Sequence, residues 1–205
     1  MLAPAVVIIL LFGNVASSNE IYINQVGDNS NYTITQDGNN NKVRSLNTTS
    51  GTASLRGNNK TFTLEQTGNN NRAGFWTHGG NQVMSLTQDG DSNVSAMDNH
   101  GNNNNMSVDI EGDGNVTHTE IGNGGDENNE IDVIINGDDN NVYAEVLNGD
   151  GNEFDIQIQN QDDGLVRVIV SGDDNKVTAW QGKHELSLIH ISEPTRRRGI
   201  SYAGF

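Results

Sequence analysis

The chain has 205 residues, a formal net charge of −16, 33% hydrophobic residues and no cysteine. Such an acidic chain is a poor partner for nucleic acid, whose phosphates bind Lys and Arg, and the lack of cysteine excludes disulfides and thiolate chemistry. The hydrophobic content is low for a chain that wraps a large globular core. We therefore expect either disorder or a fold whose core is only one side chain deep, such as a solenoid.

The first predicted segment, residues 1–18, carries no charged side chain and contains an apolar run from Ala5 to Phe12. The run is too short to span a bilayer, and the small residues Ala16 to Ser18 suit a cleavage site. We therefore predict a secretory signal peptide, although no basic residue precedes the run. The alternative is a buried first strand of the fold.

A regular repeat runs through residues 19–121. Its unit is an amide residue, five residues, a second amide, one residue, a glycine, two residues and the next amide. Between the turns, alternate residues such as Gln82, Met84, Leu86 and Gln88 share one face, which predicts strands. Gly and Asn between the strands favour turns because both tolerate positive φ. Alternation held in phase through many turns argues against disorder. It predicts an all-β solenoid of two-strand coils, about 22–24 residues each, stacked as in an amyloid-like cross-β structure.

Stacked coils would place each amide above its equivalent, so that the side-chain amides can hydrogen-bond along the stack. The predicted amide-ladder residues are Gln25, Ser30, Gln36, Asn41, Gln66, Asn71, Gln82, Gln88, Asn93, Asn99 and Asn104. The predicted turn glycines are Gly27, Gly38, Gly68, Gly79, Gly90, Gly101 and Gly112.

Residues 122–185 continue the same pattern in divergent form, with turns rich in Asp, Asn and Gly. Acidic oxygens are the ligands that Ca²⁺ prefers. The weak candidates for a calcium site are Asp113, Asp138, Asp139, Asp150, Asp173 and Asp174. Calcium-binding β-roll repeats have a period of about nine residues, whereas this period is eleven or twelve. A solvated acidic turn is the simpler interpretation, and we expect no metal or other cofactor.

Residues 186–205 abandon the repeat and carry a net charge of +2, which leaves −18 for residues 19–185. The run from Leu186 to Arg196 resembles translated sequencing-adapter sequence, as does the run from Ile200 to Phe205. We predict that this tail is an artefact; the alternative is a basic C-terminal extension. Enzymatic activity is not expected, because His78, His100, His118 and His184 lack the partner spacing of a metal site or a catalytic triad.

The segments Asn24–Asn41 and Asn81–Asn104 resemble the repeat of the curli fibre subunits, which is Ser, five residues, Gln, four residues, Asn, five residues, Gln. The resemblance implies a secreted structural subunit of an extracellular bacterial amyloid fibre, active in biofilm and adhesion. Its main partner would be itself, with a nucleator subunit and an outer-membrane secretion pore as further partners. The anchor positions depart from the family pattern in the second half, at Ile110, Ile121, Ile135, Val146, Ile158 and Val170. The alternative is a monomeric acidic β-solenoid that serves as an adhesin or a Ca²⁺-binding surface module.

Overall fold

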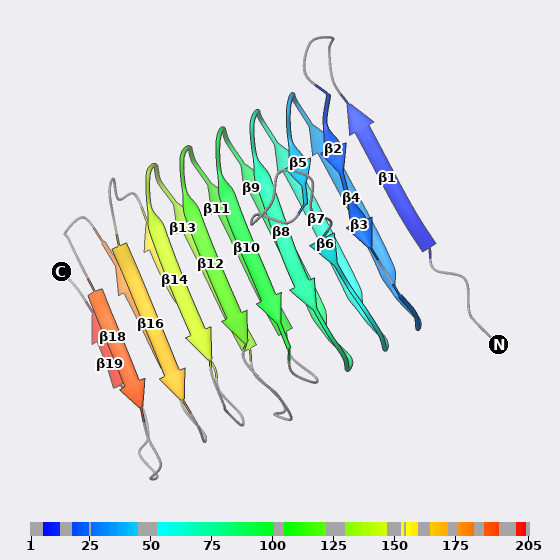
Figure 1. Ribbon diagram of the computed structural model, residues 1–205. Coiled ribbons are helices and arrows are strands. Elements are labelled where there is room, and N and C mark those ends of the chain that lie inside the picture. The colour runs from blue at the N-terminus through cyan, green and yellow to red at the C-terminus, as the bar shows by residue number, and fades with distance from the viewer. Residues whose placement is uncertain are drawn as a thin grey trace.

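The computed structural model describes residues 6–12, 18–24, 26–44, 53–100, 105–121, 130–146, 153, 155–159, 165–171, 176–182, 187–192 and 200–203. Every regular element among them is a strand, and the strands pair in parallel to form a β-solenoid (Figure 1). The predicted all-β solenoid is confirmed. Within these residues, no helix has the length and hydropathy that crossing a membrane requires.

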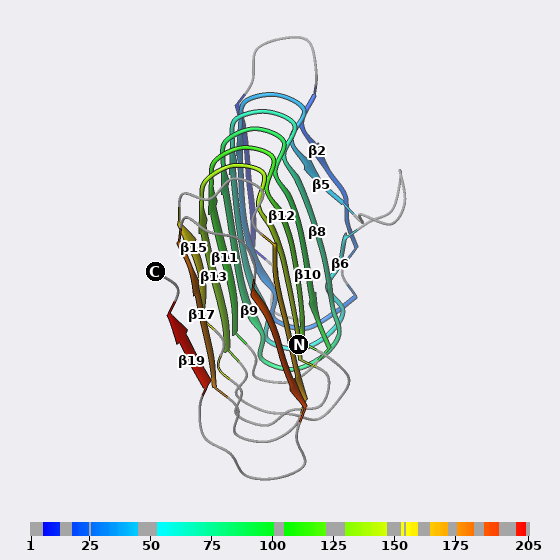
Figure 2. The same ribbon diagram turned by 90° about the vertical axis from the view of Figure 1, so that its left-hand side faces the viewer.

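The two long sides of each flattened coil belong to two sheets that face each other (Figure 2). Sheet A has the order β1 (Val6–Phe12), β4 (Asn31–Asp37), β7 (Thr61–Thr67), β9 (Val83–Asp89), β11 (Asn105–Glu111), β13 (Glu130–Asn136), β15 (Ile156–Gln159), β17 (Val177–Gln181) and β19 (Ile200–Ala203). Sheet B has the order β18 (Ser187–Ser192), β16 (Leu165–Ser171), β14 (Asn141–Val146), β12 (Val116–Ile121), β10 (Val94–Asn99), β8 (Arg72–Thr77), β5 (Lys42–Val43) and β2 (Glu20–Ile21). Beside this path, β6 (Ala53–Ser54) pairs with β3 (Ile23–Asn24) and β8.

The coil length agrees with the predicted period where the repeat is regular. Gln66 pairs with Gln88, 22 residues later. The step lengthens to 30 residues between Gln36 and Gln66 and to 25 between Asn115 and Asn140. In the first of these steps the extra residues interrupt the sheet B side of the coil between β5 and β6, because Val43 pairs with Ala73 whereas Ser54 pairs with Trp76. In the second they lie between β12 and β13.

The core is a narrow stack of inward-facing side chains between the two sheets. In β9, Met84, Leu86 and Gln88 are buried while Val83, Ser85 and Thr87 face outward, as the alternation predicts. Aromatic rings fill the first coils: Phe62 lies 4.1 Å from Phe75 across the core, between ring centroids. Aliphatic residues such as Ile131, Val133 and Ile135 fill the later ones.

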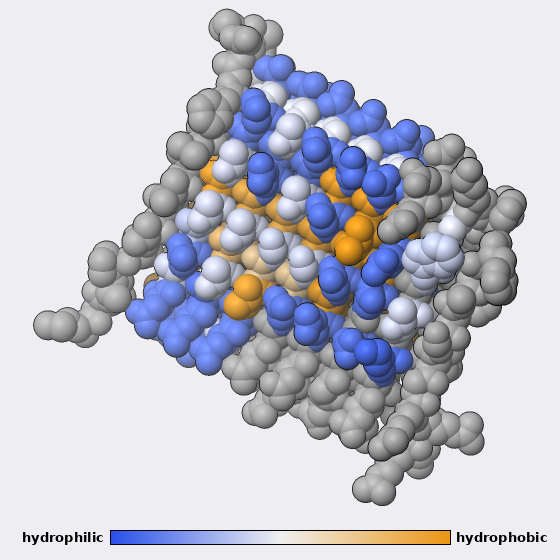
Figure 3. Space-filling view, turned by 180° about the vertical axis from the view of Figure 1, so that it is seen from behind, coloured by the Kyte–Doolittle hydropathy of each residue, from blue (hydrophilic) through white to orange (hydrophobic). Residues whose placement is uncertain are grey.

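The outer face of sheet A is mostly polar. Figure 3 shows blue and pale side chains across the strands, with apolar patches between them. One register column on this face consists of hydroxyl residues, Thr33, Thr63, Ser85 and Ser107. Exposed large hydrophobic residues are scattered over both sheets; they include Val83, Trp76 and Leu165.

Both ends of the stack carry the segments whose origin the sequence left open. Val6–Phe12, in the predicted signal peptide, forms β1 and pairs with β4. In the predicted artefactual tail, β18 pairs with β16 and β19 pairs with β17. Backbone hydrogen bonds at an open sheet edge do not select side chains. Processing of residues 1–18 and the origin of residues 186–205 therefore stay predictions.

The turn glycines fall into two series, one at each turn of the coil. Close packing of successive turns explains why one series is glycine. Gly38, Gly68, Gly90 and Gly112 all have positive φ, and a Cβ on each would collide with the carbonyl oxygen of the glycine one coil further on. At the opposite turn the positive φ falls one residue after the predicted glycine, at Asp28, Asn58 and Gly80. Gly27 itself has open space around its missing Cβ and no positive φ. Gly101 lies outside the described residues.

Replacing Gly90 with Ala should therefore destabilise the protein by at least ~2 kcal/mol, because the strained φ of +133° and the collision with Gly112 act together. The matched control is Gly27→Ala, which should change the free energy of unfolding by less than ~0.5 kcal/mol. Urea denaturation followed by far-UV circular dichroism measures both. Equal effects of the two substitutions would contradict this account of the turns.

Candidate functional site

The longest polar feature of the interior is a column of asparagines at the turn that leads from sheet A to sheet B. It consists of Asn19, Asn41, Asn71, Asn93, Asn115 and Asn140. From Asn41 to Asn140, the backbone N–H donates to Oδ1 of the asparagine one coil earlier, at 2.9–3.0 Å. From Asn19 to Asn115, Nδ2 donates to the carbonyl oxygen of the turn glycine one coil later, at 2.7–3.2 Å. The side-chain amide of each column asparagine thus bonds twice to the following coil, while its backbone N–H bonds to the preceding coil.

A second column consists of the inward glutamines near the end of the sheet A strands. Gln36 Nε2 donates to Gln66 Oε1, and Gln66 Nε2 donates to Gln88 Oε1, both at 2.7 Å. All three side chains are fully buried. Side-chain amides can hold such a chain of hydrogen bonds because each offers a donor and an acceptor.

The glutamine column ends at Gln88. In the same part of the stack, sheet B contributes hydroxyl side chains to the interior. Gln88 Nε2 donates to Ser95 Oγ at 3.1 Å, and Thr117 Oγ1 donates to the same oxygen at 2.8 Å. In the following rungs the column continues as Ile110, Ile135 and Ile158. Across from these, in the register positions of Ser95 and Thr117, sheet B carries Val142 and Val166. Aliphatic side chains therefore replace the amides of this column from Ile110 to Ile158.

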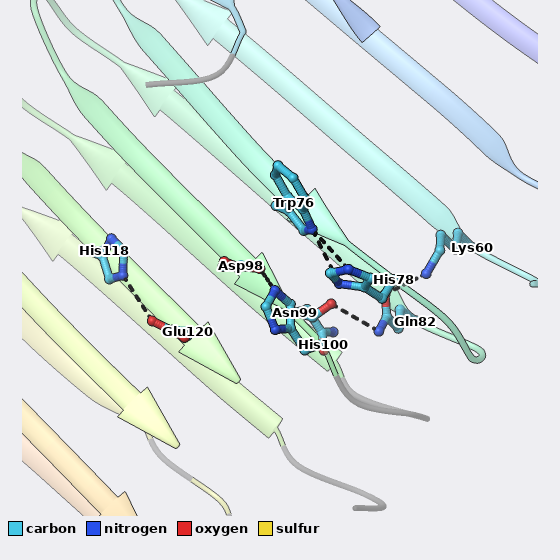
Figure 4. A network of polar contacts seen from close by, with 9 residues as sticks. All are labelled: Lys60, Trp76, His78, Gln82, Asp98, Asn99, His100, His118 and Glu120. Carbon is cyan, nitrogen blue, oxygen red and sulfur yellow. Dashed lines mark hydrogen bonds and ion pairs between the residues drawn. The ribbon is translucent and has the colours of Figure 1, made fainter. Parts of the chain in front are cut away.

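A third column contains a buried lysine at a position that its neighbours fill with uncharged polar residues. Lys60 lies in register between Ser30 and Gln82, and it is only 2% exposed. Its Nζ donates to Gln82 Oε1 at 2.7 Å and lies 3.4 Å from the carbonyl oxygen of Gly79 (Figure 4). Burial lowers the pKa of Lys60 to about 8, because the interior disfavours the charged ammonium.

The predicted ladder residues therefore belong to separate columns at the corners of the coil. Asn99 lies in the register column of Thr77 and Ile121, and its carbonyl oxygen accepts a hydrogen bond from Gln82 Nε2 at 3.3 Å. Gln25 and Asn104 lie outside the described residues. The structure adds Asn19, Asn115 and Asn140, which the predicted set omitted although Gly112 and Gly137 precede the last two at the usual spacing.

The acidic turns form an exposed column of carboxylates. Oδ1 of Asp91, Asp113 and Asp138 each accepts a hydrogen bond from the backbone N–H of the turn residue one coil earlier, at 2.7–2.8 Å. These oxygens therefore already serve to join the turns. Asp139, the third turn residue, has positive φ. Among the described residues, no group of three or more His, Cys, Asp or Glu side chains is arranged to hold a metal. Asp150, Asp173 and Asp174 lie outside those residues.

Titratable side chains gather on the outer face of sheet B (Figure 4). The Trp76 indole N–H points at the His78 ring, 3.2 Å from Nδ1, and the His78 and His100 rings meet edge to face at 4.4 Å. Burial, followed by the nearby charges of His100, Arg56 and Lys60, lowers the pKa of His78.

His100 Nε2 lies 2.8 Å from Asp98 Oδ1. Burial raises the pKa of Asp98 to about 6, and the neighbouring charges of His100, Glu120 and His118 act on it less strongly. The Asp98 carboxyl is therefore protonated more readily than an ordinary aspartate.

Comparison of the chain with protein-family models, with curated proteins and with solved structures gave no match. The fold and the columns define this protein as a β-solenoid with internal amide ladders.

Replacing Asn93 with Ala should cost about 2–4 kcal/mol of unfolding free energy, because it leaves the Asn115 N–H and the Gly112 carbonyl without their partner. Asn105→Ala is the matched control, since Asn105 is exposed on β11, and its effect should be below ~0.5 kcal/mol. Thermal or urea unfolding compares the two. A mild effect of Asn93→Ala would show that the column contributes little to stability.

Replacing Lys60 with Gln should stabilise the protein at pH 7 by roughly 1–3 kcal/mol, because an uncharged amide replaces a buried ammonium. The folded-state pKa of about 8 lies below the ordinary lysine value of 10.5. The penalty is therefore fully present below pH 8 and falls as the pH rises toward 10.5. Between pH 7.5 and 9.5, the wild type should gain stability relative to Lys60→Gln. Parallel pH profiles of the two proteins would contradict the burial of the charge.

Proposed function

We propose that this protein is the structural subunit of a secreted, self-assembling fibre of the curli-like amyloid kind, and that its coils stack end to end. The observation that carries the proposal is the asparagine column, in which the same pair of hydrogen bonds joins one coil to the next from Asn19 to Asn140. Bonds that are identical from coil to coil work equally well between coils of two molecules. Such a column can therefore continue across a junction.

The distribution of polarity supports growth along the stack axis. The outer face of sheet A is mostly polar (Figure 3), and the exposed turn carboxylates of Asp91, Asp113 and Asp138 repel copies that approach that turn from the side. At the N-terminal end, by contrast, sheet B ends at β2, which has no further strand beside it among the described residues. Unpaired backbone groups at a sheet edge accept another parallel strand. Addition of a copy is thus favoured at this end and disfavoured on the outer face of sheet A.

The wider setting follows from the same resemblance. We propose an extracellular, cell-surface location on a bacterium, with roles in biofilm and adhesion and no enzymatic activity. The principal partner would be the chain itself, with a nucleator subunit and an outer-membrane secretion pore as additional partners. The aliphatic rungs after Gln88 suggest that the first half of the solenoid contributes more to templating than the second.

A second function, that of a monomeric acidic solenoid acting as an adhesin or Ca²⁺-binding surface, has one observation in its favour. Asp91, Asp113 and Asp138 stack their carboxylates on successive coils, and cations relieve the repulsion between them. A monomer stabilised strongly by Ca²⁺ and weakly by an equal ionic strength of Na⁺ would support this alternative.

Refolding of the full chain from denaturant tests the fibre proposal. Thioflavin fluorescence should show a lag that preformed seeds abolish, and fibre diffraction of the product should show reflections near ~4.7 Å and ~10 Å. Replacing both Gln36 and Gln88 with Ala should lengthen the lag, because the buried ladder loses two members. Gln157→Ala, at a half-buried outward position of β15, is the control. A stable β-rich monomer that ignores seeds would overturn the proposal.

A further inference from the structure

The outer face of sheet B differs in charge from the outer face of sheet A. The outward positions of β4, β7, β9, β11 and β13 in sheet A hold carboxylates such as Glu65 and Asp109, and no Lys or Arg. The outward positions of the described strands of sheet B hold both signs of charge. The cations among them are Lys42, Arg44, Arg56, Arg72 and Arg167. Two sheet A faces therefore repel each other, whereas two sheet B faces can attract if opposite charges meet.

The charges on the sheet B face follow an order along the stack that is complementary to its own reverse. From β2 to β16, coil by coil, the outward charged residues are Glu20, then Lys42, Arg44 and Arg56, then Arg72, Asp98, Glu120, Glu145 and Arg167. Reversing this order about β10 sets β2 opposite β16, the coil of β5 and β6 opposite β14, and β8 opposite β12. Each of these three pairs of coils joins a net negative charge to a net positive one.

Contacts within the chain leave this pattern in place. Glu20 lies 3.5 Å from Lys42 Nζ and 3.7 Å from Arg44 Nη1, but one carboxylate cannot neutralise the whole coil of β5 and β6. Arg56 on that coil is exposed and lies over the Trp76 ring, 5.6 Å from its centroid. On β10, the only coil that would meet its own copy, Asp98 Oδ1 is paired with His100 Nε2 at 2.8 Å (Figure 4).

Exposed apolar side chains follow the same reversal. Tyr22, on the coil of β2, and Leu165, on β16, are each 44% exposed, and Trp76 on β8 and Val116 on β12 are each 41% exposed. The face from β2 to β16 measures ~20 Å along the strands and ~30 Å along the stack. A pair would thus bury ~600 Å² or more per copy, which is the lower limit of a specific interface.

We propose that two copies of this protein pair through the outer faces of sheet B, with their stack axes antiparallel and β10 of one copy lying against β10 of its partner. Opposite charges then face each other at every level except β10. A pair with parallel stack axes would instead set the basic coils against each other, which is unfavourable. This pairing goes beyond the proposed fibre function and does not depend on it. In a fibre, it would join two stacks side by side.

Sedimentation velocity of the freshly refolded full chain, from ~1 to ~100 µM, tests the pairing. In ~0.15 M salt the Debye length is about 8 Å, so the repulsion between two acidic chains is screened while facing charges still interact. The wild type should form a reversible dimer. Glu145→Arg should weaken the dimer about tenfold, because it turns two attractive contacts of the pair into repulsive ones. Arg56→Glu should weaken it to a similar extent.

The double variant Arg56→Glu/Glu145→Arg should recover the wild-type dimer, because the two positions exchange their charges across the pair. Glu65→Arg is the matched control, since it makes the same change of charge on the outer face of sheet A, and it should leave the dimer unchanged. Far-UV circular dichroism checks that each variant keeps the fold.

A wild type that stays monomeric over this range overturns the proposal, and so does a dimer that neither single substitution weakens. An effect of Glu65→Arg as large as that of Glu145→Arg would place the contact on sheet A. Single variants that weaken the dimer without recovery in the double variant would overturn the antiparallel arrangement. Seeded fibre growth by a wild type that forms no dimer would leave the fibre function standing.

Discussion

Every part of this structure depends on parallel stacking in which each coil lies directly over the one before it. Because equivalent residues meet at a spacing of about 4.8 Å, any side chain or backbone group must be compatible with copies of itself above and below. Asparagine satisfies this requirement because its side chain accepts from and donates to the following coil, while its backbone N–H donates to the asparagine side chain of the preceding coil. Glycine satisfies it at the turns because there is no room for a Cβ between successive carbonyl groups. These two residue types recur for that reason.

The same requirement explains how polar groups are tolerated in so narrow a core. A buried amide is costly unless its donor and acceptor are both used, and a column uses both at every rung except its ends. The glutamine column therefore needs a polar neighbour where it stops, which Ser95 provides for Gln88. Its other end, at Gln36, keeps an unused acceptor. Burying polar side chains in this core therefore costs little free energy along a column and more where the column ends.

This asymmetry between the middle and the ends connects the architecture to the proposed function. Within the stack the asparagine and glutamine columns are hydrogen-bonded from coil to coil, and the outer face of sheet A is mostly polar. At the ends, strand edges and column termini have partners to gain. A molecule built in this way lowers its free energy by adding a coil, whether that coil comes from its own chain or from another. Growth of the stack is then controlled by the segment that covers its end.

The sequence by itself determined the fold class and the inward face of each strand, because alternation with period two and turns at a fixed spacing leave few other arrangements. It also indicated where the amide ladder changes to isoleucine at Ile110. Only the tertiary structure decided which residues share a column, since the irregular steps after Gln36 and Asn115 change the pairing in ways that period counting does not show. The burial of Lys60 and the pairing of Leu11 with Gln36 were likewise decided by stacking. Contacts between coils join residues 22 to 30 positions apart in the chain, so local patterns predict the coil but not its partner above.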